Sequence, residues 1–163
     1  MSSNRVLVSE SAWQVVREAA AASHPTETGG ILIGVRVDGA FWITRAIEIA
    51  PRFRLPRAYQ VPRGVTRRHV RVARRSDSRL GYLGDWHSHP MDVPASRVDR
   101  ETLRRTAQRD SEPTLMLVAR RGESTYHPDI YQADRNTVGL CEITFVGDLR
   151  DDVPNEEQEK SNG

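Results

Sequence analysis

The sequence is poor in cysteine and in long apolar stretches. One cysteine, Cys141, stands in the apolar run GLCEITFV, so no internal disulfide can form and a small buried side chain is expected there. No apolar run approaches the ~18–20 residues of a membrane span, and MSSNRVLVSE lacks the apolar core of a signal peptide. These absences predict a soluble protein of a reducing, cytoplasmic compartment, with no membrane partner.

Lysine is almost absent as well, because Lys160 is the only one and arginine supplies the other basic charges. A GC-rich genome explains this composition, and so does the avoidance of lysine modification by a protein that works among lysine-modifying enzymes. The net charge of +2 hides an asymmetry, since residues 151–163 (DDVPNEEQEKSNG) contain five acidic residues and one lysine. Without them the remaining chain is clearly basic.

A chain of 163 residues predicts one domain, residues 1–150, followed by an acidic disordered tail, residues 151–163. Apolar patterning predicts strands at 5–10, 29–37, 40–49, 80–89, 114–120, 129–132 and 139–146. Asp38-Gly39 predicts a hairpin between the second and third of them. Helical spacing predicts helices from Ser11, as the N-cap, to residue 24, over 65–75, and from Ser96 to about Gln108. This mixed order predicts an α+β fold in which helices flank a sheet.

The stretch GDWHSHPMDVPASRVD, residues 84–99, contains two histidines at strand spacing. Side chains two apart in a strand point to the same face, so His87 and His89 place two imidazoles together. A divalent metal would remove the repulsion between them, and zinc binds imidazole nitrogen. A solvent-facing pair at a strand end is the alternative interpretation.

The next candidate residues are Ser96 and Asp99, which follow two prolines. Ser96 can cap the third helix, with Asp99 in its first turn, and this is a simple capping arrangement. The same geometry could turn the carboxylate toward the strand end as a third metal ligand. Two imidazoles and a carboxylate leave a fourth position for water, as in catalytic zinc sites, whereas a structural zinc site prefers more cysteine than this chain has.

Hydrolysis also requires a base that takes a proton from water and passes it to the leaving amine. The candidate is Glu27 in ETGGILIG, which precedes an apolar strand. Gly29 and Gly30 follow it, and their lack of side chains allows close approach. A solvated acid at the start of a strand is the alternative.

Together, ETGGILIG, GDWHSHP and Ser96-x-x-Asp99 resemble the signature of the JAMM (MPN+) metalloproteases, most closely the prokaryotic JAB branch. The resemblance covers about residues 5–148. It implies a JAB/MPN fold related to the cytidine deaminases, with a central, mixed, curved sheet flanked by helices. The family usually has seven residues between the second histidine and the serine, and this chain has six. We expect the helix start to shift as a unit.

The same resemblance implies the roles of the site residues. One zinc ion would be held by His87, His89 and Asp99, with Glu27 as the acid and base acting on the water. Ser96 would donate a hydrogen bond to the carbonyl oxygen that gains charge in the tetrahedral intermediate. The remaining histidines lie outside this spacing and are expected to be dispensable: His24, His69 and His127.

Enzymes of this family cleave after the C-terminal Gly-Gly of ubiquitin or ubiquitin-like proteins. The resemblance therefore implies a bacterial zinc isopeptidase or peptidase, whose partners are a ubiquitin-like protein, its conjugates and its conjugating enzymes. The substrate could belong to a conjugation system (including antiphage operons), to a modified signalling enzyme or to a sulfur-carrier precursor. Two alternatives stay open: a non-catalytic MPN scaffold, and a basic nucleic-acid-associated domain like the RadC relatives.

The segment 52–79 is dense in arginine. It could be a solvated helix face, or a docking surface for an acidic partner. A nucleic-acid groove is a third interpretation, but it requires aromatic side chains for stacking, and only Phe53 and Tyr59 occur there. A related hypothesis is that residues 151–163 fold over this surface and inhibit it.

Overall fold

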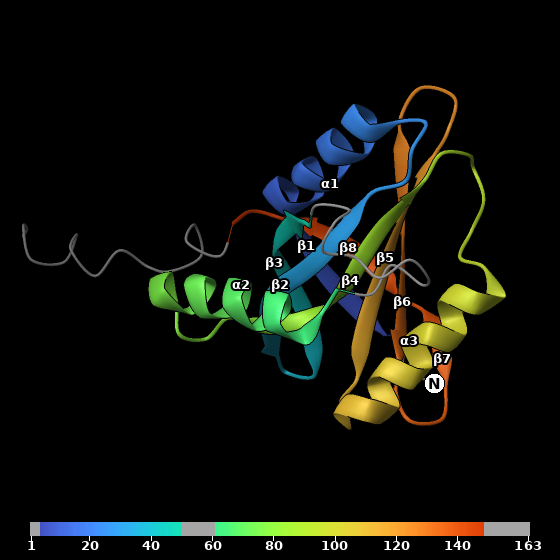
Figure 1. The fold of residues 1–163 in the computed structure, drawn as a ribbon. Coiled ribbons are helices and arrows are strands. Elements are labelled where there is room, and N and C mark those ends of the chain that lie inside the picture. The colour runs from blue at the N-terminus through green and yellow to red at the C-terminus, as the bar shows by residue number, and fades with distance from the viewer. Residues whose placement is uncertain (1–3, 50–60, 149–163) are drawn as a thin grey trace, which may run out of the picture.

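The structure is a computed structural model that describes residues 4–49 and 61–148. Its elements in chain order are β1 (Arg5–Ser9), α1 (Glu10–Ser23), β2 (Gly29–Val37), β3 (Ala40–Glu48), α2 (Arg63–Ser76), β4 (Gly81–His89), α3 (Arg97–Asp110), β5 (Thr114–Arg121), β6 (Tyr126–Ala133), β7 (Val138–Leu140) and β8 (Glu142–Val146). The described strands form one sheet in the order β7-β6-β5-β4-β2-β3-β1-β8 (Figure 1). The sheet contains both parallel and antiparallel pairs, which confirms the predicted α+β class with a mixed sheet flanked by helices.

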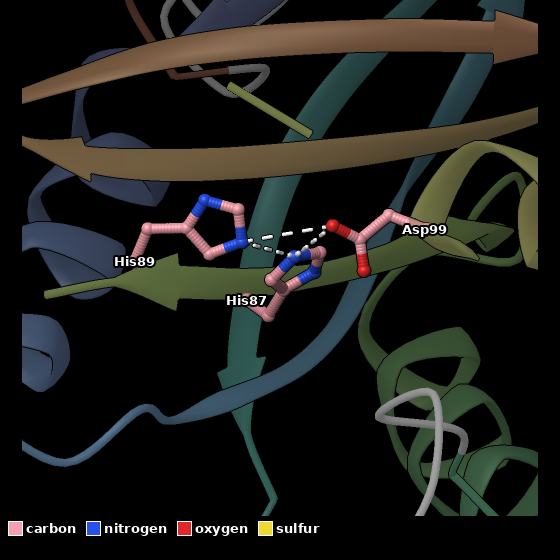
Figure 2. A group of neighbouring side chains, drawn as sticks. All are labelled: His87, His89 and Asp99. Atoms are coloured by element: carbon pink, nitrogen blue, oxygen red, sulfur yellow. Dashed lines mark hydrogen bonds and ion pairs between the residues drawn. The ribbon is translucent and has the colours of Figure 1, made fainter. Parts of the chain in front are cut away.

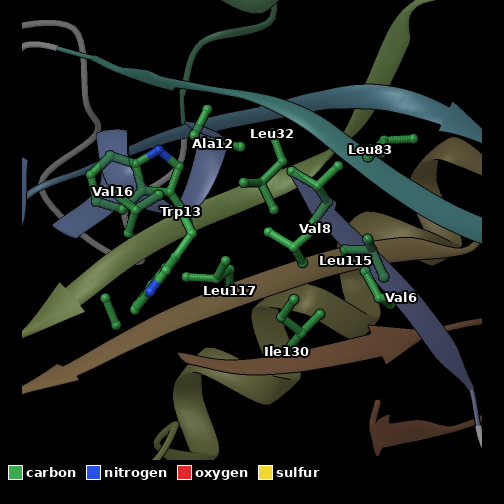
Figure 3. Close-up of a cluster of buried hydrophobic side chains, with 14 of the residues drawn as sticks. Val6, Val8, Ala12, Trp13, Val16, Leu32, Leu83, Leu115, Leu117 and Ile130 are labelled. Atoms are coloured by element: carbon green, nitrogen blue, oxygen red, sulfur yellow. The ribbon is translucent and has the colours of Figure 1, made fainter. Parts of the chain in front are cut away.

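The helices cover both faces of the sheet. On one face, Trp13 of α1 packs in the cluster that contains Leu117 of β5 (Figure 3). Leu103 of α3 packs in a second cluster with Val118, the neighbour of Leu117 in the same strand. Because consecutive strand residues point to opposite faces, α1 and α3 lie on opposite sides of the sheet. The predicted metal site lies on the side of α3.

Helix α2 contributes little to the core. Its one fully buried residue is Ala73, which packs with Ile31 and Ile33 of β2, while Val65 and Val70 are half-buried against the same cluster. The remaining surface of α2 is available for polar side chains, and arginines dominate it. None of the helices in the described residues is long and apolar enough to cross a lipid bilayer.

Two details of the predicted elements are wrong. Helix α1 begins at Glu10 with Ser9 at the N-cap position, and the hydroxyl of Ser11 instead hydrogen-bonds the carboxylate of Asp148. The single strand expected at 139–146 is interrupted at Cys141, so that β7 pairs with β6 whereas β8 pairs with β1 at the other edge of the sheet.

The interruption has a physical cause in the curvature of the sheet. The amide of Cys141 donates to the carbonyl of Ile130 in β6 at 2.8 Å, and the next amide, of Glu142, donates to the carbonyl of Asn4 beside β1 at 2.8 Å. Two consecutive residues therefore bond to strands far apart in the sheet order, which requires the sheet to curl. Cys141 is half-buried against the core, and this burial raises the pKa of its thiol to about 12.

Some predictions fall outside the described residues. These include the tail, residues 151–163, and both aromatic residues of the arginine-dense segment, Phe53 and Tyr59. The boundary between the domain and its tail therefore stays a prediction. The later part of that segment is described and forms α2.

Candidate metal centre

The two histidines at the end of β4 face each other. His87 and His89 are both buried, and their Nε2 atoms lie 3.1 Å apart (Figure 2). The Nδ1 atom of His89 lies 2.8 Å from the carbonyl oxygen of Val93. Because a carbonyl can only accept, Nδ1 of His89 carries the proton and Nε2 presents its lone pair. The strand pattern thus brings the pair together as predicted, and a backbone carbonyl fixes one ring.

Helix α3 supplies the third predicted ligand through its N-terminal cap. The Ser96 hydroxyl accepts a hydrogen bond from the Asp99 amide at 3.1 Å, and Asp99 Oδ2 accepts one from the Ser96 amide at 2.8 Å. The same Oδ2 atom lies 3.6 Å from His87 Nε2 and 3.7 Å from His89 Nε2. The capping interpretation of Ser96-x-x-Asp99 is therefore confirmed, and the same geometry brings the carboxylate close to the histidines across the six-residue loop.

These three ligand atoms fit a small metal ion. Bonds of about 2.0–2.2 Å around a tetrahedral zinc ion separate its ligand atoms by roughly 3.3–3.6 Å. The observed separations of 3.1, 3.6 and 3.7 Å bracket this range. His87, His89 and Asp99 can therefore hold one metal ion, and the donor set of two nitrogens and one oxygen suits zinc.

Electrostatics favours a negative carboxylate at this position. Partial burial opposes ionisation of Asp99, but the nearby imidazoles of His87 and His89 outweigh it and hold the pKa of Asp99 well below its ordinary value. The nearby Asp99 carboxylate raises the pKa of His89 against the effect of burial, and the charge of Glu27 acts in the same direction. The two carboxylates thus make the surroundings of the histidines negative, which favours a bound cation.

Glu27 lies beside this group, two residues before the start of β2. The Ser88 amide donates to the Thr28 carbonyl at 2.8 Å, and the Thr28 amide donates to the Ser88 hydroxyl at 3.0 Å. Gly29 pairs with His87 in the antiparallel ladder, and continuing this register sets the half-buried Glu27 opposite His89. The effect of the Glu27 charge on the pKa of His89 agrees with this placement.

The first glycine after Glu27 allows the close approach that the sequence predicts. A Cβ atom at Gly29 would lie 3.3 Å from the Cβ of His87 and would clash with the backbone carbonyl of Trp86. Any side chain at Gly29 would therefore push β2 away from the strand that carries the histidines. The pairing of β2 with β4 therefore requires a residue without a side chain at Gly29, as predicted.

Sequence patterns did not indicate two supports of the site. Ser88 points away from the ligands, yet it is buried and its hydroxyl fixes the backbone next to Glu27. Arg120 of β5 forms ion pairs with Asp92, in the loop between β4 and α3, and with Asp129 of β6. Both supports join residues that are far apart in the sequence, so a local motif cannot reveal them.

The other histidines lie elsewhere. His24 and His127 are exposed, and His69 is half-buried on α2. Within residues 4–49 and 61–148, His87, His89 and Asp99 form the one group of potential ligands close enough to share a metal ion. Glu27 and Ser96 are not members of this group, so their catalytic roles stay predictions.

Comparisons with known proteins agree with this architecture. Residues 9–133 match the family model described as prokaryotic homologs of the JAB domain. The solution structure of a protein from Desulfitobacterium hafniense superposes with a TM-score of 0.63 at 18% sequence identity, covering 90% of this chain and 97% of that one. At this identity the likeness shows the fold alone. No curated protein sequence matches the chain.

Proposed function

Because the chain belongs to the family of prokaryotic homologs of the JAB domain, we propose that it is a zinc-dependent isopeptidase or peptidase. The observation that carries this proposal is the convergence of His87, His89 and Asp99 on one small ligand triangle. A JAB-family domain can also be non-catalytic. The complete ligand set favours the enzyme over a scaffold, because a scaffold has no need to keep two buried histidines and a half-buried aspartate together.

The residues divide the chemistry between them. His87, His89 and Asp99 would hold the zinc ion, which would supply Lewis-acid activation of water. The Glu27 carboxylate would act as the base that accepts a proton from the attacking water and passes it to the leaving amine. The Ser96 hydroxyl uses its oxygen to accept from the Asp99 amide, which leaves its proton to donate to the carbonyl oxygen of the scissile bond.

The proposed substrate is a ubiquitin-like protein, cleaved after its C-terminal glycine during deconjugation or precursor processing. A Gly-Gly tail suits the site because it brings no side chains past the crowded strand ends of β2 and β4. A bacterial, cytoplasmic setting, conjugating enzymes as further partners and the likeness to cytidine deaminases belong to the same proposal. Support for them comes from the family and from the composition of the chain.

Metal content is the first test, since it requires no knowledge of the substrate. Purified protein should contain about one zinc ion per chain by mass spectrometry, and His89→Ala should contain almost none. His127→Ala is the matched control, because this histidine is exposed and outside the site. If wild-type protein binds no metal even after zinc is supplied, the scaffold interpretation replaces the enzyme.

Cleavage is the second test. Ubiquitin-like proteins with a fluorogenic amide on the C-terminal glycine should be hydrolysed by the wild type. Glu27→Ala should keep its zinc and lose at least about 100-fold in rate, since general acid–base catalysis contributes roughly 10²–10⁴-fold. Full turnover by the zinc-loaded Glu27→Ala protein would remove Glu27 from the mechanism.

A further inference from the structure

A second feature of the same face is a cleft of about 1000 Å³ between α2 and the C-terminal part of α3. Its floor is the first half of β4, at Tyr82 and Asp85. One wall is formed by α2 and the other by residues at the end of α3, and together they include Arg63, Arg67, Arg71, Arg74, Arg109 and Asp110. Basic side chains therefore dominate a concave surface that the metal site does not use.

The arginines of the cleft differ in their partners. Arg63 and Arg109 both form ion pairs with Asp110, at 3.3 and 2.9 Å. Arg67, Arg71 and Arg74 follow one another on the same side of α2, and all three are exposed. Across the described part of the chain, no carboxylate lies within ion-pair distance of these three.

In helix α3, by contrast, two arginines have an acidic partner on the same helix. Glu101 of α3 forms an ion pair with Arg105 at 3.0 Å and lies 4.0 Å from Arg104. Helix α2 has no acidic residue in its sequence, so Arg67 and Arg71, four residues apart, repel each other without compensation. This repulsion would be relieved by negative charge in the cleft.

The acidic side chains that line the cleft are already engaged. Asp110 pairs with Arg63 and Arg109, Glu112 pairs with Arg36 at 3.3 Å, and Asp85 accepts a hydrogen bond from the Tyr82 hydroxyl at 3.0 Å. The uncompensated charge of the cleft is therefore positive. Its complement is a chain segment with several carboxylates.

We propose that this cleft binds an acidic segment of a partner protein through Arg67, Arg71 and Arg74. Guanidinium groups bind carboxylates in planar, two-point contacts, and a row of three suits an extended segment. Asp85 lines both this cleft and the small hollow beside His87, and two residues along a strand span about 7 Å. The bound segment would therefore lie next to the metal site. Binding requires no metal and no catalysis.

The test uses the full chain and a fluorescein-labelled decaglutamate peptide, with binding measured by fluorescence anisotropy at low ionic strength. The double variant Arg67→Glu/Arg71→Glu should weaken binding at least about tenfold. The matched control is Arg68→Glu/Arg75→Glu, which makes the same charge change at exposed positions of α2 outside the cleft. It should change the affinity by less than about twofold, and thermal unfolding should show that both variants are folded.

Four outcomes would overturn the proposal. The first is no binding by the wild type, and the second is an equal loss in both double variants, which would indicate only net charge. The third is tighter, equally cleft-dependent binding of a single-stranded oligothymidylate, which would identify the partner as nucleic acid. The fourth is a higher peptide affinity of the full-length variant Glu156→Gln/Glu157→Gln/Glu159→Gln, which would make the chain's own tail the occupant.

Discussion

Asp85 and Asp99 lie on either side of His87 in the sequence, and their environments shift their pKa values in opposite directions. Asp99 lies within ion-pair distance of two imidazoles, which lower its pKa although it is partly buried. Burial raises the pKa of Asp85 to about 7, and the Tyr82 hydrogen bond and the charge of Arg109 offset this only in part. The fold therefore favours the charged form of Asp99, which faces the two imidazoles. It disfavours the charged form of Asp85, which lies two residues before His87 on the same face of β4.

The largest expected effect comes from removing the favoured charge. Asp99→Asn keeps an oxygen that can accept from the Ser96 amide, so the cap of α3 should survive. The negative ligand is lost, and zinc affinity should fall at least about 100-fold, more than for loss of an outer-shell residue. Competition with a chelator of known affinity measures the change.

The control for Asp99→Asn is Asp110→Asn, at the other end of the same helix. Asp110 pairs with Arg63 and Arg109 but with no metal ligand, so zinc affinity should stay within about twofold. In metal-free Asp99→Asn, the pKa of His89, followed by NMR titration, should fall toward the ordinary value of about 6.5. An unchanged zinc affinity in Asp99→Asn would mean that the carboxylate is not a ligand.

The raised pKa of Asp85 predicts that stability depends on pH. A pKa of about 7 in the folded chain exceeds the ordinary value of about 3.9, so folded Asp85 keeps a proton that the unfolded chain has lost between these values. The free energy of unfolding should therefore decrease as the pH rises from about 4 to 7, by on the order of 3 kcal/mol. Asp85→Asn should remove this contribution.

The measurement is urea unfolding of wild type and Asp85→Asn across that pH range, both with chelator so that no metal is bound. The difference between the two proteins isolates Asp85 from the other titrating groups. Its sign is opposite to that of Asp99, whose pairing stabilises the fold above about pH 3.9 and is lost in acid. Parallel curves for wild type and Asp85→Asn would show that Asp85 titrates normally.

The proposed metal ligands could be predicted from the sequence. His87 and His89 follow from strand periodicity, and Ser96 with Asp99 follows from the spacing of a helix cap, so short-range rules place the proposed ligands. These four residues can be found from the sequence because each rule applies within a few residues. The close approach at Gly29 followed in the same way, since a glycine pair next to a strand indicates crowding.

The unpredicted features depend on contacts between distant segments. Asp85 is half-buried because α2 and α3 flank its strand, and no local pattern distinguishes it from a solvated acid. The interruption at Cys141 results from the curl of the sheet, whereas the run GLCEITFV is locally a good strand. The pairing of Arg63 with Asp110 likewise requires two helices to meet, 47 positions apart in the chain.

The smallest expected effect concerns the hydrogen bond from Tyr82, which favours the charged form of Asp85 against the effect of burial. Tyr82→Phe removes the hydroxyl that donates to Asp85 at 3.0 Å and favours its charged form. The pKa of Asp85 should rise further, and stability at neutral pH should fall by about 0.5–1.5 kcal/mol. Urea unfolding at several pH values measures both. In the Asp85→Asn background the same substitution should cost a similar energy at every pH, because asparagine accepts the bond without titrating. A pH-dependent cost in that background would assign the effect to a group other than Asp85.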